Sequence, residues 1–217
     1  MDTPAYETAS HWNKFYRSTE AEHLILPSQF AAFVAGEAPH EAFVVDMGCG
    51  SGRDALFFAS QGHSVIGVDA SKSAIDHCSE MARNTNLRAR FVQAEVQSPV
   101  WTLAVQSASA YQSAPALIVY ARFFLHAIPE EGEDALLDAV CRIAKPGHTM
   151  LAVEFRTPRD ATLPKSTACH FRRFSPPSEL LAKAVERGMK IDYFVEGFGF
   201  AKYGADDAHV ARCIFIL

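Results

Sequence analysis

The stretch that decides the fold is residues 46–53, Asp-Met-Gly-Cys-Gly-Ser-Gly-Arg, at the end of the apolar run 42–47. The run is typical of a short buried strand. Glycines at alternate positions let the chain turn sharply and bring its backbone close to a ligand. Residues 53–61 have a helical pattern, and a helix starting there would direct its free N–H groups at the same ligand. The stretch therefore predicts a strand, a ligand-binding glycine loop and a helix.

The spacing of these glycines does not match the binding motifs of two common ligands. A dinucleotide fingerprint, G-x-G-x-x-G, needs a third glycine where this chain has Arg53. A phosphate-binding P-loop needs Gly-Lys followed by Ser or Thr, which is also missing from this stretch.

Outward from the loop, strand and helix patterns alternate. Four helices are predicted. The first begins at Arg53, the second follows a Ser71 cap, and the third follows Pro129 and ends near residue 144. The fourth begins at Pro176, with Ser175 as its cap, and ends at Gly188. Residues 98–115 show no clear pattern, and residues 156–174 read as a long loop. The predicted strands are 42–47, 63–69, 88–94, 116–121, 149–155, 191–196 and a final one around 210–216.

This alternation predicts an α/β fold, a Rossmann-like, doubly wound sheet of seven strands. The link between the last two strands is short and favours a hairpin, so the last strand should be antiparallel in a mostly parallel sheet. Residues 1–217 are expected to form a single domain, with residues 1–40 as a helical lid or cap.

Composition restricts the function classes. The chain has 217 residues, 49% hydrophobic and 21% charged, and its net charge of −5 gives no basic field for nucleic acid. Its five cysteines are widely spaced without a C-x-x-C pair, which favours reduced thiols and no metal site. No signal peptide or membrane-spanning run is evident. We expect a cytoplasmic protein without a nucleic-acid or membrane partner; its oligomeric state stays open.

Ligands of parallel sheets bind at the carboxyl ends of the strands, which directs attention to the residues that end them. Asp69 ends the second predicted strand, where a carboxylate can accept hydrogen bonds from both ribose hydroxyls. The alternative is a helix-capping aspartate. NAD enzymes use the same ribose contact, so Asp69 alone does not separate the two cofactors.

The acidic residue, the G-x-G-x-G loop and the order of the elements together resemble the class I S-adenosylmethionine-dependent methyltransferases. The resemblance covers nearly the whole chain and implies S-adenosyl-L-methionine as cofactor and S-adenosyl-L-homocysteine as product. It implies that Gly48, Gly50 and Gly52 line the cofactor and that Asp46 helps to hold its ammonium group. The ribose and adenine would lie near Asp69, Ala70, Glu95 and Val96. Glu95 stands where the family commonly has Asp, and Val96 could make the adenine contact through its backbone instead.

The segment after the fourth strand is where the family's acceptor lies. Here Arg122 and His126 stand among apolar residues, where a polar side chain needs a partner. His126 could be the general base for an acceptor hydroxyl, and Arg122 could bind an anionic group of the acceptor. The alternative is that both are structural.

The long loop after the fifth strand is basic in an acidic protein. It contributes His170 as a second candidate base and three candidate acceptor-binding arginines, Arg156, Arg172 and Arg173. A solvated surface loop is the alternative. In the N-terminal segment, Trp12, Phe15 and Tyr16 share one helical face. Tyr16 is a candidate acceptor contact in a lid, although a helix docked on the core has the same pattern.

Residues 12–16, 120–126 and 199–203 resemble a bacterial subgroup that is associated with sugars, capsular polysaccharide and phosphate-bearing metabolites. The leading hypothesis is therefore methyl transfer to a small polar acceptor, at an oxygen of a sugar or of a phosphate- or carboxylate-bearing metabolite. An NAD(P)-dependent oxidoreductase and a non-catalytic S-adenosylmethionine-binding regulator remain as alternatives.

Overall fold

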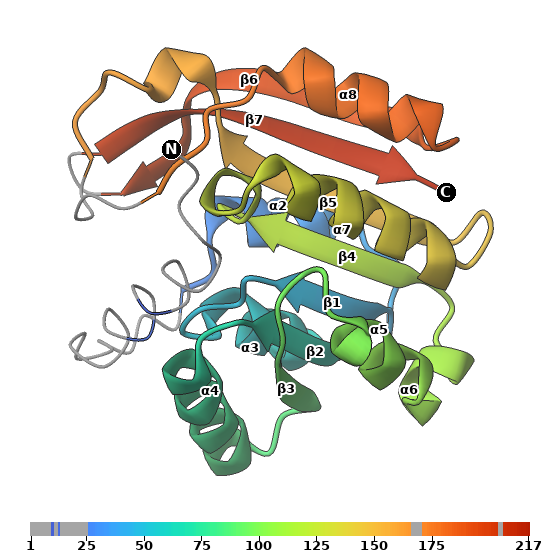
Figure 1. Cartoon of the computed structure of the whole chain (residues 1–217). Coiled ribbons are helices and arrows are strands. Elements are labelled where there is room, and N and C mark those ends of the chain that lie inside the picture. Colours follow the sequence, from blue (N-terminus) through green and yellow to red (C-terminus); the bar gives the residue numbers. More distant parts are fainter. Residues whose placement is uncertain (1–9, 11–12, 14–25, 166–170, 204–205) are drawn as a thin grey trace.

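The computed structural model describes residues 10, 13, 26–165, 171–203 and 206–217. Its seven strands form one sheet in the order β3-β2-β1-β4-β5-β7-β6, in which β1 to β5 are parallel and β7 runs antiparallel to both neighbours (Figure 1). The expected α/β class, strand number and antiparallel last strand are confirmed. The strands are β1 (Phe43–Met47), β2 (Ser64–Asp69), β3 (Ala89–Gln93), β4 (Leu117–Arg122), β5 (Thr149–Arg156), β6 (Lys190–Tyr203) and β7 (Asp206–Ile216).

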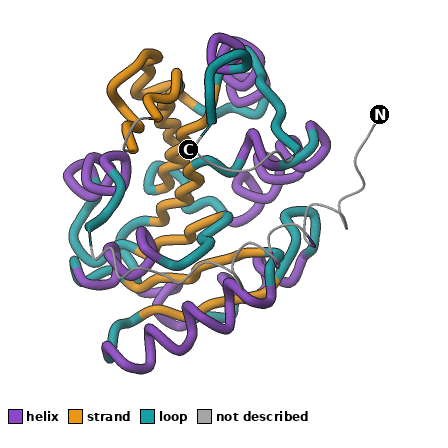
Figure 2. The backbone as a smooth tube through the Cα atoms, turned by 90° about the vertical axis from the view of Figure 1, so that its left-hand side faces the viewer, coloured by secondary structure: helices purple, strands orange, loops and turns teal. Residues whose placement is uncertain are grey.

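The helices pack on both faces of the twisted sheet (Figure 2). The α-helices are α2 (Gln29–Glu37), α3 (Arg53–Ser60), α4 (Lys72–Thr85), α5 (Pro99–Gln106), α6 (Ser109–Ser113), α7 (Glu130–Ile143) and α8 (Pro177–Glu186). Two short 3-10 helices, η1 (Leu125–Ala127) and η2 (Pro158–Asp160), follow β4 and β5.

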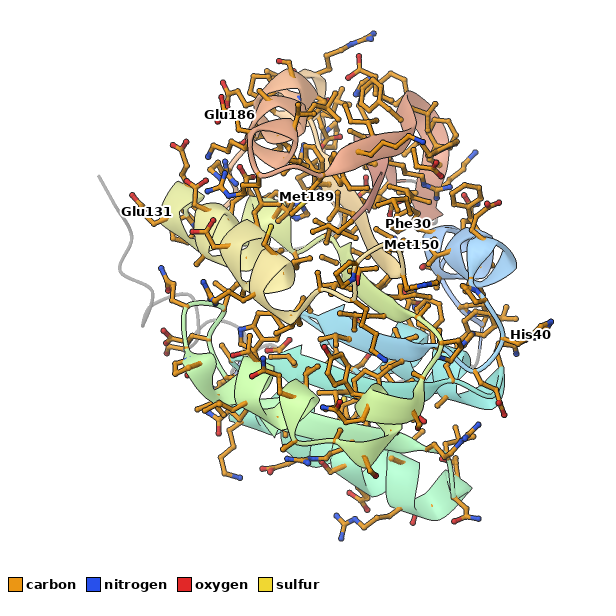
Figure 3. The ribbon with its side chains drawn as sticks, turned by 90° about the vertical axis from the view of Figure 1, so that its right-hand side faces the viewer. Phe30, His40, Glu131, Met150, Glu186 and Met189 are labelled. Carbon is orange, nitrogen blue, oxygen red and sulfur yellow. The ribbon has the colours of Figure 1, made fainter. Side chains whose placement is uncertain are left out.

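Two apolar clusters stabilise the sheet, one on each face. Side chains of α5, α7 and α8 form one cluster with the central strands. Side chains of α2 and α3 form the other, which includes Phe30 with Met150 packed against it. Figure 3 shows Phe30 and Met150 together near α2, and Met189 apart from them near α7 and α8. Because both faces are covered, the central strands are mostly apolar, as expected for a parallel sheet, and most of their charged residues lie toward their carboxyl ends.

The structure shows two helices in a segment without a clear sequence pattern, and it corrects two expectations about single elements. Residues 98–115 contain α5 and α6, and α5 begins at Pro99 after Ser98, whose Oγ accepts a hydrogen bond from the backbone N–H of Val100. Helix α8 begins one residue later than expected, with Pro176 at its N-cap and no side-chain cap. Strand β6 extends to residue 203, well past the expected 196, because it continues to pair with β7 beyond the end of β5.

The parallel strands all end at one edge of the sheet. The carboxyl ends of β1 and β4 point to the left in Figure 1, so the glycine loop, Asp69 and the segment after Arg122 come together there. This is the edge at which ligands of such sheets bind.

Candidate functional site

The glycine loop has the backbone conformation that its sequence requires. Gly48, Gly50 and Gly52 have φ of 70°, 53° and 78°, a left-handed region that other residues rarely adopt. At Gly48 and Gly52, close packing is a second reason why the position requires glycine. A Cβ on Gly48 would lie 2.5 Å from the Phe124 ring, and one on Gly52 would lie 2.8 Å from the Cys78 sulfur. The loop therefore fits closely between Cys78 of α4 and the segment after β4.

Asp69 joins the glycine loop to the start of α4. Its Oδ2 accepts a hydrogen bond from the backbone N–H of Gly50 at 3.0 Å, and its Oδ1 accepts one from that of Ser71 at 2.8 Å. Burial raises the pKa of Asp69, although both backbone hydrogen bonds act to lower it. Each carboxylate oxygen keeps a second lone pair, so the group can still accept hydrogen bonds from a ligand.

Asp46 lies beneath the loop and is almost completely buried. Desolvation raises its pKa well above the usual value, and the nearby carboxyl groups of Asp54 and Asp69 raise it further. The charge of Arg53 acts in the opposite direction. An acidic group held in this way is stabilised in its charged form by an incoming cation.

The structure places the expected adenine-side residues at the end of β3. Glu95 is exposed, and Val96 is buried with its carbonyl accepting the indole N–H of Trp101 at 2.9 Å. Ala70 is half-buried beside Asp69. Their roles in binding stay predictions.

Asn13 in the N-terminal segment contacts this region directly. Its Oδ1 accepts hydrogen bonds from Ser71 Oγ at 2.9 Å and from the backbone N–H of Ser73 at 3.2 Å. Ser71 is also the N-cap of α4, where its Oγ accepts the N–H of Ala74. The N-terminal segment is thereby connected to the helix start next to Asp69.

A buried network that the sequence did not indicate joins α2, α3 and β4. Asp54 accepts hydrogen bonds from the Ser28 backbone N–H at 2.8 Å, from Ser28 Oγ at 2.7 Å and from Tyr120 Oη at 2.9 Å. Arg53 Nε donates to the same carboxylate at 3.0 Å. Asp54 was detectable only as an acidic residue in the first turn of α3.

On the other side of the loop, Arg122 ends β4 and pairs with a fully buried carboxylate. Its Nε donates to Glu154 Oε1 at 2.9 Å, while Arg212 Nε donates to Glu154 Oε2 at 2.6 Å. The Arg122 side chain keeps 19% exposure, and its two Nη atoms have no acceptor among the described residues. Two arginines on one glutamate leave an excess of one positive charge here.

Phe123 links the arginines to His126. It is a non-glycine residue with a φ of 54°, which is a strained conformation that is found disproportionately at functional sites. The guanidinium groups of Arg122 and Arg156 lie 4.3 and 5.2 Å from its ring centroid. The ring of His126 meets it edge-on at 5.3 Å, so the candidate base is close to Arg122 but is itself buried.

Two arginines expected to bind the acceptor are engaged with protein groups instead. Arg156 donates to Asp160 at 2.6 Å and to Asp206 at 2.9 Å. Arg173 donates to Glu133 and to Ser175 Oγ, each at 2.5 Å. These contacts favour a structural role for both. Their role in acceptor binding stays a prediction, as does that of Arg172, which is half-buried.

Tyr16 and His170 lie outside the described residues, so their predicted roles are not addressed by the geometry. Among the described residues, no cluster of His, Cys, Asp and Glu could hold a metal ion, and no helix is long and apolar enough to cross a membrane.

Known proteins agree with this geometry. Residues 44–147 match the family model of a methyltransferase domain. The fold is similar to that of a SAM-dependent methyltransferase from Anabaena variabilis, with 18% identity, a TM-score of 0.71, and 99% of this chain and 96% of that chain covered. It is also similar to a TehB-like SAM-dependent methyltransferase from Corynebacterium glutamicum, with 16% identity, a TM-score of 0.63, and 98% and 99% covered.

A third similar structure shows why the fold alone does not define the reaction. The cyclase SpnF shares 16% identity at a TM-score of 0.68, with 97% of this chain and 93% of that chain covered. The assignment therefore depends on the family match over the glycine loop and its neighbours. Over residues 44–147 the chain carries a methyltransferase domain of the class I, S-adenosylmethionine-dependent type, with S-adenosylmethionine as the methyl donor.

The residues present fit this cofactor. Its ammonium and sulfonium groups are cationic and its ribose carries hydroxyls, while three carboxyl groups, Asp46, Asp54 and Asp69, surround the glycine loop. Together with the family match, this fit favours methyl transfer over the oxidoreductase.

Proposed function

We propose that this methyltransferase acts on an oxygen of a small polar acceptor that bears a phosphate or carboxylate group, such as an acidic or phosphorylated sugar. The observation that carries the proposal is Arg122, which is held by Glu154 through Nε while its Nη atoms have no acceptor among the described residues. A guanidinium fork with two such N–H-bearing nitrogens matches the geometry of a carboxylate or phosphate.

The position of Arg122 suits an acceptor next to the cofactor. The next residues in the chain turn sharply at Phe123, and Phe124 packs on Gly48 of the cofactor loop. An anion bound at Arg122 would therefore place the rest of a small acceptor near the donor site. When bound, the cofactor supplies an activated methyl group on a sulfonium, so the protein's main contribution is alignment of the reacting atoms.

His126 is the proposed general base for the acceptor hydroxyl, with His170 as the second candidate. The ordinary pKa of histidine is about 6.5, which suits proton removal at neutral pH. Arg122 and Tyr16 would orient the acceptor. The proposed acceptor site also includes three basic side chains, Arg156, Arg172 and Arg173. Arg156 acts mainly by holding the loop after β5 in place, and Arg173 by holding the segment after β4.

We also propose a single catalytic domain in which the N-terminal residues that precede α2 form a cap over the bound ligands, because α2 itself packs in the core. The hydrogen bonds of Asn13 to the start of α4 support this arrangement. A cytoplasmic location is supported by the four described cysteines, which form no disulfide with one another.

Mass spectrometry with isotopically labelled S-adenosylmethionine tests the acceptor class. The enzyme would be incubated with panels of phosphorylated sugars, sugar acids, neutral sugars and apolar alcohols. We expect a labelled methyl ester or ether only on anionic members. Efficient transfer to a neutral apolar compound, with no activity on anionic ones, would overturn the proposal and leave the methyltransferase class intact.

A further inference from the structure

We propose that Arg53 binds the carboxylate at the methionine end of the cofactor. This inference rests on the cofactor class and is independent of the acceptor proposed above. It concerns a residue that the sequence pattern singled out only because it replaces the third glycine of a dinucleotide fingerprint.

Arg53 is positioned at the glycine loop and held from one side. It is the first residue of α3, directly after Gly52. Its Nε lies 3.0 Å from Asp54 Oδ1, whereas its Nη2 reaches Asp54 Oδ2 only at 3.5 Å. Nη1 has no acceptor among the described residues, and the side chain is 28% exposed. Most of the guanidinium's N–H groups thus remain available to a ligand.

The neighbouring network fixes the direction of Arg53. Asp54 is held by Ser28 and Tyr120, which are themselves within 3.0 Å of each other through their hydroxyl oxygens. Because this carboxylate is buried and fully engaged, it is a rigid anchor for Nε. A preorganised guanidinium loses little freedom on binding an anion.

The charge pattern around the loop favours such a cation. The methionine end of the cofactor is a zwitterion, with an ammonium and a carboxylate on one carbon. Asp46 suits the ammonium, but Asp46, Asp54 and Asp69 would all repel the carboxylate. Arg53 is close enough to Asp46 that each affects the charge state of the other. An Asp46 and Arg53 pair can therefore receive both halves of the zwitterion.

The test compares two ligands that differ only in this carboxylate. S-adenosylmethionine and its decarboxylated form, which keeps the ammonium and the sulfonium, are titrated by calorimetry into the wild type, Arg53→Met, Arg53→Lys and Arg83→Met. Arg83 is exposed on α4 and serves as the matched control. Thermal unfolding of each free variant checks that the fold is retained.

We expect the wild type and Arg83→Met to bind S-adenosylmethionine about 10- to 100-fold more tightly than the decarboxylated form. This is the usual effect of losing hydrogen bonds between charged groups, which the decarboxylated form cannot make with Arg53. Arg53→Met should bind the decarboxylated form at the wild type's level and S-adenosylmethionine no more tightly than that, because the three carboxyl groups repel the carboxylate once the arginine is gone. Arg53→Lys should fall between the wild type and Arg53→Met.

The proposal is wrong if Arg53→Met weakens both ligands in parallel, because Arg53 would then only support the loop. It is equally wrong if the variant keeps the preference. If Arg53→Met instead raises only the KM of an anionic acceptor, the arginine belongs to the acceptor site. The titrations contain no acceptor. The role of Arg53 can therefore be decided even if the proposed acceptor class is wrong.

Discussion

At the scale of single residues, Asp69 shows how one carboxylate can serve both structure and binding. It already accepts the N–H groups of Gly50 and Ser71, and the predicted ribose contacts use its remaining lone pairs. Asp69→Ala should therefore weaken cofactor binding by about 2–4 kcal/mol, because two charge-assisted hydrogen bonds are lost. Calorimetry with S-adenosylhomocysteine measures this loss. Unchanged affinity together with a lower melting temperature would show that Asp69 is only a helix and loop cap.

Asp46 should make both cofactor affinity and stability depend on pH. Burial raises its pKa, so the free protein keeps this carboxyl protonated at pH values where the unfolded chain has lost the proton. The resulting stability is fully present below the unfolded pKa of about 3.9 and is lost as the pH rises through the higher folded pKa. Cofactor affinity should change in the opposite direction, increasing with pH as the carboxylate forms.

Asp46→Asn removes this titration and provides the control. Between pH 4 and pH 8, the unfolding free energy of Asp46→Asn should decrease less than that of the wild type. The variant should also bind the cofactor more weakly, and its affinity should change less with pH. Urea titrations and calorimetry across this range measure both. Parallel profiles for the two proteins would contradict the role given to Asp46.

The site was predictable from sequence only where its residues are neighbours in the chain. The glycine loop and Asp69 follow from short motifs at strand ends. The Ser28, Asp54 and Tyr120 network joins residues 26 and 66 positions apart, and Glu154 and Arg212 are 58 apart. Only the folded sheet brings such residues together. For the same reason, sequence could not show that Arg156 and Arg173 are engaged by carboxylates while Arg122 is engaged through Nε alone.

Arg122 and His126 should affect different kinetic constants once an acceptor is identified. Arg122→Ala leaves Glu154 paired with Arg212, so the fold should survive while the acceptor KM rises. His126→Ala should lower kcat by about 10²–10⁴-fold, the usual contribution of a general base. Steady-state kinetics and cofactor titration separate these effects. Arg142→Ala on α7 is the control, and a loss of cofactor affinity in either site variant would argue for a structural role.

At the scale of elements, periodicity located the central strands and long helices to within a residue or two. The errors lie where tertiary context decides. Strand β6 is longer than its apolar pattern because its partner β7 supplies hydrogen bonds beyond the core. Helices α5 and α6 are only eight and five residues long, so they lack a strong periodic signal. Helix α8 starts at the second of two prolines, and both prolines are compatible with a first turn.

The contact between α2, α3 and β4 should depend strongly on Asp54. Tyr120→Phe removes one hydroxyl from the network and should lower the unfolding free energy by about 1–2 kcal/mol. Asp54→Ala leaves Arg53 and two hydroxyl groups without their acceptor and should cost about 3–5 kcal/mol. Urea unfolding compares the two. Equal and small losses would mean that apolar packing around Phe30 and Phe58, and not this network, holds α2 in place.

At the scale of the whole molecule, the sheet connects the two halves of the proposed site. Strands β1 and β2 carry the cofactor residues, and β4, β5 and β7 carry Arg122, Glu154 and Arg212. The glycine loop and Phe124 are in contact between them. A ligand at this edge bridges elements from both halves, so its binding energy should appear as stability of the entire fold.

Unfolding in the presence of ligands therefore tests the class assignment on the whole molecule. A ligand that binds only the folded state stabilises it by RT ln(1 + [L]/Kd), about 2.7 kcal/mol at one hundred times Kd. S-adenosylmethionine and S-adenosylhomocysteine should each raise the unfolding free energy by that amount in a single cooperative transition. NAD should leave it unchanged, because Arg53 stands where a dinucleotide fingerprint requires glycine. Stabilisation by NAD with no response to either adenosyl ligand would overturn the cofactor assignment, and Asp69→Ala should reduce the response to both adenosyl ligands.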